Sequence, residues 1–201
     1  VIKIKNTLNE SNYKGDIPRI GMRMQLPKEY ENLSYFGRGP WENYQDRNAA
    51  AFVDVYTSKV KDQYVPYIRP QDNGYKTDTR WLALSNNNNE GLLIATGSEN
   101  LLSFSALHME NEDFDTTEGI DYENSNIRKH TIDIKEKNIV QLNIDLGQRG
   151  VAGDDSWKSK PQEKYQYKGT NKHTYSFYLV PFENKTKVDF IKLSKYYISQ
   201  E

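Results

Sequence analysis

The chain has 201 residues, enough for one large domain or two small ones with a substantial core. Its 27 Lys and Arg residues nearly balance 28 Asp and Glu residues, for a formal net charge of −1. We therefore expect neither a nucleic-acid nor a membrane partner. The absence of cysteine excludes disulfides, thiolate catalysis and cysteine-based zinc sites. Both cytoplasm and periplasm of a bacterium remain open for a soluble protein of this composition.

Apolar residues recur at a spacing of two along most of the chain, which predicts strands separated by turns and little helix. The opening residues, VIKIKNTLNE, already read as a strand. A first residue of Val with strand alternation from the outset indicates a fragment of a longer polypeptide. A second strand is predicted from Ile20 to Leu26 and ends at Pro27.

Residues 33–47, LSYFGRGPWENYQDR, place several charged side chains in one loop. Their simplest interpretation is an ion-pair network that fixes the loop, and the alternative is a role in binding substrate. The charged residues concerned are Arg38, Glu42, Asp46 and Arg47.

Another strand is predicted from Lys76 to Leu84, followed by a turn of four asparagines. Residues 92–96 and 101–107 are the most apolar segments, and we expect them at the centres of sheets. Residues 110–123 hold seven acidic residues in fourteen, which favours a solvated loop over a cation site.

The three histidines do not have the spacing of a metal site. We expect each of them at the surface or in a hydrogen bond. They are His108, His130 and His173.

Residues 139–161, IVQLNIDLGQRGVAGDDSWKSKP, join a strand to a glycine-rich turn. Apolar residues at 140, 142, 144 and 146 alternate with Gln141, Asn143 and Asp145, which predicts one buried and one wetter face. The glycines then let the chain turn sharply and present residues 154–157 at a sheet edge.

Trp157 has few apolar neighbours in sequence, and Asp154, Asp155 and Ser156 precede it directly. An exposed indole of this kind suits sugar binding, because it contacts the C–H face of a pyranose while polar neighbours bind hydroxyls. The alternative is a ring folded back onto the core. Adjacent carboxylates on an extended chain point to opposite faces, so the two aspartates suit hydrogen bonding within the turn better than paired catalysis.

Four segments taken together, IPRIGMRMQL, LSYFGRGPWENYQDR, YVPYIRPQDNG and GVAGDDSW, resemble one family. They are similar to the C-terminal small-chain domain (domain 5) of lacZ-type β-galactosidases, glycoside hydrolase family 2. The resemblance runs from Ile17 to Phe182 in the same order. It implies an all-β fold, an antiparallel super-sandwich of the galactose-mutarotase-like kind that is truncated at its N-terminus. We expect residues 1–182 to form this sandwich and residues 183–201 to form an extension, as an extra strand or a linker.

The resemblance also implies a function for the whole enzyme, the hydrolysis of terminal β-D-galactosides such as lactose. The catalytic glutamates lie on a (β/α)₈ barrel elsewhere in the polypeptide, so no catalytic residue is expected in this chain. Trp157 is implied to contact the β-galactoside, or glucose on the aglycone side, with Asp154, Asp155 and Ser156 supporting its loop. We expect no cofactor in this chain and place any Mg or Na site of the whole enzyme outside it. The catalytic barrel is the expected partner, in a homo-oligomer.

Two other functions stay open. A freestanding carbohydrate-binding module of similar fold would bind glycans unaided, and a mutarotase-like sugar epimerase would interconvert anomers. An epimerase of this kind needs a His and a Glu in a shared pocket, and the sequence does not single out such a pair.

Overall fold

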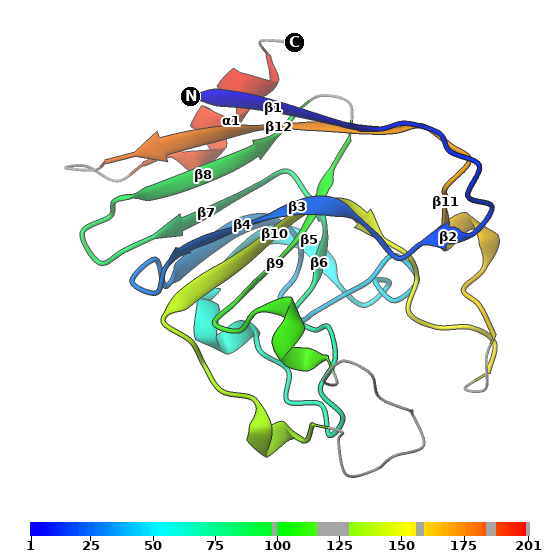
Figure 1. The fold of residues 1–201 in the computed structure, drawn as a ribbon. Helices are drawn as coiled ribbons and strands as arrows, with labels where there is room; N and C mark the ends of the chain where they lie inside the picture. The colour runs from blue at the N-terminus through cyan, green and yellow to red at the C-terminus, as the bar shows by residue number, and fades with distance from the viewer. Residues whose placement is uncertain (98–99, 116–128, 156–158, 184–187, 200–201) are drawn as a thin grey trace.

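The computed structural model describes residues 1–97, 100–115, 129–155, 159–183 and 188–199. It is an antiparallel β-sandwich, which confirms the expected all-β fold (Figure 1). A six-stranded sheet has the order β1 (Ile2–Leu8), β12 (His173–Phe182), β8 (Gly91–Thr96), β7 (Trp81–Ser85), β4 (Asn32–Gly39) and β5 (Phe52–Lys59). A four-stranded sheet has the order β3 (Arg19–Pro27), β10 (Ile139–Gln148), β9 (Leu102–Leu107) and β6 (Lys76–Thr79).

Short elements complete the fold. A two-stranded ribbon pairs β2 (Asp16–Ile17) with β11 (Tyr167–Lys168). Among the described residues, the short 3₁₀ helices are η1 (Val60–Gln63), η2 (Asn111–Phe114), η4 (Thr131–Asp133) and η5 (Glu163–Tyr165), and the α-helix α1 (Phe190–Ile198) lies near the C-terminus. None of the helices in the described part of the chain has the length and apolarity to cross a membrane.

The core lies between the two sheets, where apolar side chains on the inner face of one sheet meet those on the inner face of the other. Leu82 and Ile94 of the six-stranded sheet and Phe104 and Leu142 of the four-stranded sheet belong to one buried cluster. Full burial of each such side chain contributes roughly 1.5–3 kcal/mol. Strands β8 and β9 lie inside their sheets, so the central position expected for the most apolar segments is confirmed.

The segment predicted as a single strand from Lys76 to Leu84 is instead two strands in different sheets. Strand β6 ends at Thr79, and the N–H of Arg80 donates to the carbonyl of Phe36 at 2.7 Å before β7 begins. Asp78 has φ 52°, a left-handed conformation in which Asp is among the tolerated residues. The β-branched and aromatic residues of this segment correctly indicate extended chain. They do not show that the chain passes from one sheet to the other at Arg80.

The polar face of β10 is buried, so the expectation of a wetter face was wrong. Gln141, Asn143 and Asp145 are each at most 4% exposed. They are paired with polar side chains of neighbouring elements: the Asn143 amide donates to Ser105 Oγ at 2.9 Å, and Arg19 donates to Asp145. Strand alternation distinguishes the two faces, but it does not show that other segments cover the polar one.

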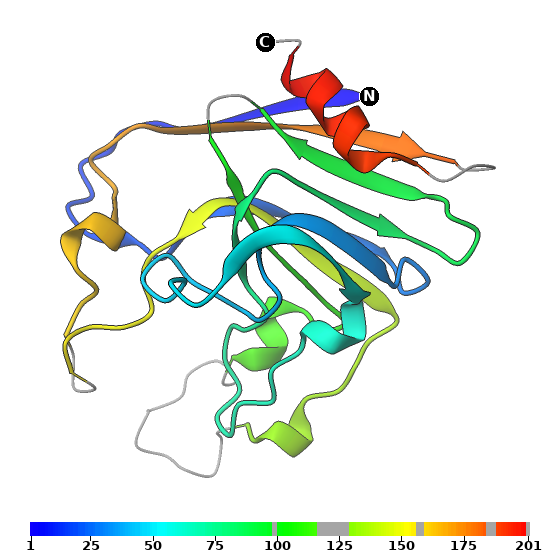
Figure 2. The same cartoon turned by 180° about the vertical axis from the view of Figure 1, so that it is seen from behind.

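Residues 190–198 form a helix rather than the extra strand or linker expected from the sequence. Asp189 caps its N-terminus, because its side chain accepts the N–H of Lys192 at 2.9 Å. Phe190, Leu193 and Tyr197 then recur at helical spacing and pack on the outer face of the six-stranded sheet, where Figure 2 shows α1 in front of the sheet. The helical pattern covers nine residues, too few to stand out beside the strand pattern of the rest.

Candidate functional site

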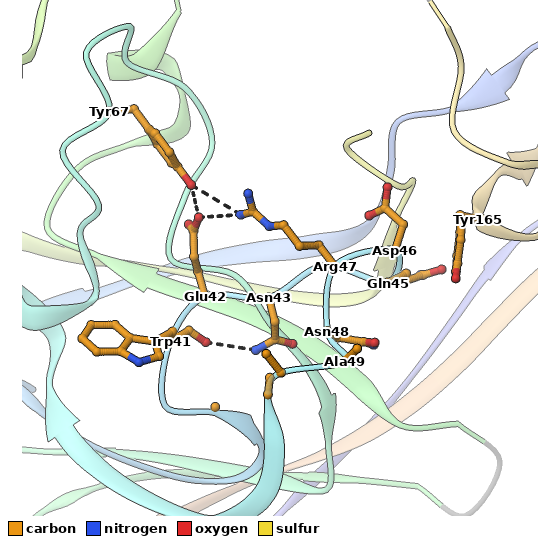
Figure 3. Close-up of a pocket in the computed structure, with 13 residues that line it drawn as sticks. Trp41, Glu42, Asn43, Gln45, Asp46, Arg47, Asn48, Ala49, Tyr67 and Tyr165 are labelled. Atoms are coloured by element: carbon orange, nitrogen blue, oxygen red, sulfur yellow. Dashed lines mark hydrogen bonds and ion pairs between the residues drawn. The ribbon is translucent and has the colours of Figure 1, made fainter. Parts of the chain in front are cut away.

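A pocket of about 690 Å³ opens where β4 ends and the chain turns into the loop of residues 40–51. The loop supplies most of its wall, and Tyr67 and Tyr165 complete it. Figure 3 shows Trp41 on one side of the pocket and Asp46 and Tyr165 on the other. The indole of Trp41 is 81% exposed.

Asn43 fixes the loop to the sheet. Its side-chain oxygen accepts the N–H of Thr77 at 3.0 Å and the Thr77 hydroxyl at 2.6 Å. Its amide nitrogen donates to the carbonyls of Arg38 and Trp41, each at 3.1 Å. Because this buried amide uses both its oxygen and its nitrogen, the loop is held to β6 without a regular helix or strand.

Glu42 ties this loop to the segment of residues 64–74. Its Oε1 accepts from Arg47 Nη2 at 2.7 Å and from the Tyr67 hydroxyl (Figure 3). Its Oε2 accepts the N–H of Gly74 at 2.9 Å. Partial burial and then the hydrogen bond to Glu42 raise the pKa of Tyr67, so its hydroxyl stays a proton donor. The predicted ion-pair network is therefore confirmed for Glu42 and Arg47.

The other two charged residues of the motif have different partners. Arg38 pairs with Asp78 and donates to the carbonyl of Ala51 at 2.8 Å. Asp46 binds a backbone group instead of a cation: its Oδ2 accepts the N–H of Ala152 at 2.9 Å. This contact joins the loop of residues 40–51 to the glycine-rich turn that the sequence singled out.

The base of the glycine-rich turn contacts two residues that line the pocket, Asp46 and Tyr165. Gly150 donates its N–H to the carbonyl of Tyr165 at 2.9 Å, and a Cβ at Gly150 would lie 2.6 Å from Oδ2 of Asp46. A side chain at position 150 would therefore push the turn away from Asp46. A Cβ at Gly153 would lie 2.3 Å from the carbonyl oxygen of Ser159, so the two ends of segment 153–159 touch.

Of the four predicted site residues, Asp154 and Asp155 are described and both are exposed. Ser156 and Trp157 lie outside the described residues. The sequence did not indicate the residues that hold this turn, namely Asp46 through its carboxylate and Tyr165 through its carbonyl. The signal that could have found them is Gly150, because a glycine within a polar turn often marks the close approach of another group.

The pocket is suited to binding and support more than to proton transfer. Of its two carboxylates, Glu42 accepts hydrogen bonds on both oxygens and Asp46 on Oδ2. The other oxygen of Asp46, Oδ1, is buried and has no hydrogen-bond partner within the described residues. Across that same part of the chain, no cluster of three or more acidic or histidine side chains is arranged to hold a metal ion.

A His–Glu pair does exist, but it lies at the opposite end of β4. His108 Nε2 faces the carboxylate of Glu31, and its Nδ1 lies 2.7 Å from the carbonyl of Ile139. Glu31 precedes β4, whereas the pocket starts at its last residue, Gly39, and eight strand residues span roughly 26 Å. The pair is thus separate from the pocket. The expectation that the histidines lie at the surface or in hydrogen bonds holds for all three.

The described part of the acidic segment is held by cations. Glu110 and Asp113 both pair with Lys137, and Glu112 pairs with Arg23. Residues 116–123 of the segment lie outside the described residues.

Comparison with known proteins gives one consistent result. The family model described as the beta galactosidase small chain matches residues 1–179. A β-galactosidase of Priestia megaterium is 33% identical over 183 residues, which cover 90% of this chain and 16% of the relative. A β-galactosidase of Vibrio cholerae is 34% identical over 77% of this chain and 14% of the relative. A β-galactosidase of Streptococcus thermophilus is 26% identical over 85% of this chain and 16% of the relative. The chain thus spans about one sixth of the length of the relatives that it matches.

Proposed function

Because the chain belongs to the β-galactosidase small-chain family, we propose that it works as the C-terminal domain of a longer β-galactosidase. In this proposal it completes the sugar-binding site, while a (β/α)₈ barrel elsewhere in the polypeptide carries the two catalytic glutamates. The whole enzyme hydrolyses terminal β-D-galactosides such as lactose. The chain itself contributes binding, and alone it does not hydrolyse a galactoside.

The observation that supports this role is the placement of the turn at residues 150–155. It is held by two hydrogen bonds to residues that line the pocket, from the Ala152 N–H to Asp46 and from the Gly150 N–H to the carbonyl of Tyr165. In sequence, Trp157 follows this anchored turn directly. A turn held at its base is a suitable support for a ring that has to meet a sugar in a fixed orientation.

The proposed role of Trp157 is a flat wall on the aglycone side of the site. Its indole contacts the C–H face of the galactoside, or of glucose as leaving group, and Asp154, Asp155 and Ser156 support the loop. An aromatic contact adds roughly 0.5–1.5 kcal/mol to the free energy of apolar burial. Such a wall touches the substrate before and during bond cleavage, so it acts mainly on binding.

The experiment that tests this function is Trp157→Ala in the whole enzyme, followed by steady-state kinetics on lactose. The expected loss of roughly 1–3 kcal/mol raises KM by about one to two decades and changes kcat less. Tyr196→Ala removes an aromatic ring of α1, at a residue that is 57% exposed, and serves as the control. An unchanged KM in folded Trp157→Ala enzyme contradicts the proposal.

A second experiment tests the division of labour. The isolated chain is expected to give no hydrolysis of an aryl β-galactoside above background, and addition of the upstream part of the enzyme is expected to restore turnover. Hydrolysis by the isolated chain that survives repeated purification would show that it carries its own catalytic groups.

The exposed indole of Trp41 favours a second candidate, a carbohydrate-binding module that acts without a catalytic barrel. Calorimetric titration of the chain with galactose and lactose separates the two functions. The domain of a larger enzyme is expected to bind either sugar negligibly when alone, whereas a module binds it measurably. A polarimetric assay on freshly dissolved α-galactose tests the third function, because an epimerase speeds the interconversion of the anomers and the other two functions do not.

A further inference from the structure

Asp46 connects two loops that are far apart in sequence. Its Oδ2 accepts the N–H of Ala152 at 2.9 Å, across a separation of 106 residues. The Cα of Gly150 lies so close that an added Cβ would be 2.6 Å from the same oxygen. The turn therefore rests on this carboxylate through a hydrogen bond and through direct contact.

Asp46 cannot easily move, because the residues on both sides of it are fixed. Tyr44 and Arg47 exchange backbone hydrogen bonds of 3.2 and 2.8 Å, which closes a tight turn around Gln45 and Asp46. The Arg47 guanidinium is paired with Glu42, and the Gln45 amide donates to the Tyr167 hydroxyl. A carboxylate on such a rigid turn sets the position of whatever binds it.

We propose that Asp46 is a positioning residue for the sugar-binding site: it holds the turn of residues 150–155 in place, and it acts on substrate through Trp157 rather than by touching it. This inference rests on the proposed function. A neutral amide oxygen at position 46 still accepts the Ala152 N–H, whereas a methyl group does not. The two substitutions Asp46→Asn and Asp46→Ala therefore separate the hydrogen bond from the rest of the side chain.

The test is a double-mutant cycle in the whole enzyme, with KM and kcat for lactose measured in Asp46→Ala, Trp157→Ala and the double variant. A hydrogen bond to a charged acceptor corresponds to roughly a 10-fold change in an equilibrium, so Asp46→Ala is expected to raise KM by about that factor. Asp46→Asn is expected to retain most of the wild-type KM. In the Trp157→Ala background, Asp46→Ala is expected to change KM less than about 2-fold, because its route to the substrate is gone.

Hydrogen exchange at the Ala152 amide gives a readout that is independent of activity. Protection of this amide is expected to fall about 10-fold or more in Asp46→Ala and to be largely kept in Asp46→Asn. The matched control is Asp54→Ala on the exposed strand β5, where the carboxylate accepts the N–H of its neighbour Val55. It is expected to change neither KM nor exchange at Ala152.

Two outcomes overturn the inference. One is unchanged exchange at Ala152 in Asp46→Ala, because the turn is then held without Asp46. The other is an effect of Asp46→Ala on KM that is equally large with and without Trp157, because Asp46 then acts by another route. Failure of the proposed function is recognised separately, by an unchanged KM in Trp157→Ala alone. If Asp46→Ala does not fold, Gly150→Ala in both backgrounds gives the same comparison, because an added Cβ pushes the turn away from Asp46.

Discussion

Asp145 on β10 and Arg19 on β3 form an ion pair inside the protein, with Oδ2 of Asp145 2.6 Å from Nε of Arg19. The hydroxyl of Tyr75 donates to the same oxygen at 3.0 Å. Burial raises the pKa of Asp145 to about 6, although the charge of Arg19 and the two hydrogen bonds act in the opposite direction. Folding therefore makes this carboxyl harder to ionise.

The first prediction is that the contribution of Asp145 to the unfolding free energy falls as the pH rises. Between about pH 4 and pH 6 the folded state keeps a proton that the unfolded state has lost. The contribution is fully present below pH 4 and is lost as the pH rises through 6. The unfolding free energy of wild type minus that of Asp145→Asn is expected to fall by roughly 3 kcal/mol from pH 4 to pH 7. Urea unfolding of both proteins at several pH values measures it, and a difference that grows with pH contradicts the prediction.

The second prediction concerns Glu42, whose carboxylate joins two loops around the pocket. Glu42→Gln loses the charge that holds Arg47 and one acceptor position shared with Tyr67. Because Arg47 is half exposed, we expect a modest loss of about 1–2 kcal/mol in the unfolding free energy. Glu136→Gln breaks an exposed pair with Lys28 and is expected to cost less than about 0.5 kcal/mol. Equal losses in the two variants would mean that the Glu42 network adds nothing beyond a surface ion pair.

The third prediction concerns β5, an edge strand with apolar side chains in solvent. It pairs with β4 on one side, and Val53 and Val55 are 40% and 41% exposed. Such an edge recruits further strands, so the chain is expected to self-associate in light scattering. Val55→Lys is expected to reduce the association, whereas Ile191→Lys on α1 adds the same charge away from the edge. A monomer over a wide range of wild-type concentrations would show that the sandwich protects its own edges.

The fourth prediction concerns helix α1 as a cover for the outer face of the sheet. The Phe190 ring lies 5.5 Å from the Trp81 ring and 5.2 Å from the Phe182 ring, centroid to centroid. Phe190→Ala is expected to lower the unfolding free energy by roughly 1–3 kcal/mol, because Phe190 is only half buried. Trp81 fluorescence is expected to shift to longer wavelength, as water reaches the ring. An unchanged emission spectrum would mean that the helix does not shield Trp81.

Periodicity predicted most of the strands and could not predict their partners. The alternation from Ile20 to Leu26 and from Val140 to Leu146 corresponds to β3 and β10, which pair although more than 100 residues separate them. A period of two identifies the face that is buried, not the strand that lies beside it. The burial of Asp145 could not be predicted either, because the segments that bury it come from other parts of the chain.

The site was predictable in its motifs and not in its contacts. The segments around Glu42 and Gly150 were both singled out, one as an ion-pair network and one as a sugar-facing turn. Asp46 was grouped with the nearby arginines because neighbouring opposite charges usually pair. Its actual partner is the backbone N–H of Ala152 on a distant loop. Every residue except proline has a backbone N–H, so the sequence does not indicate which one binds Asp46.

The pairing of the first strand with the last one described has a consequence for biosynthesis. Ile2 of β1 lies opposite Leu179 of β12, so 177 residues separate the two partners. Ribosomes add about 5–20 residues per second, and β1 therefore emerges roughly 9 to 35 s before its neighbour. During this interval the six-stranded sheet lacks the strand that joins β1 to β8 (Figure 1). The six-stranded sheet therefore closes only after β12 has been synthesised, and until then β1 exposes an edge without its partner strand.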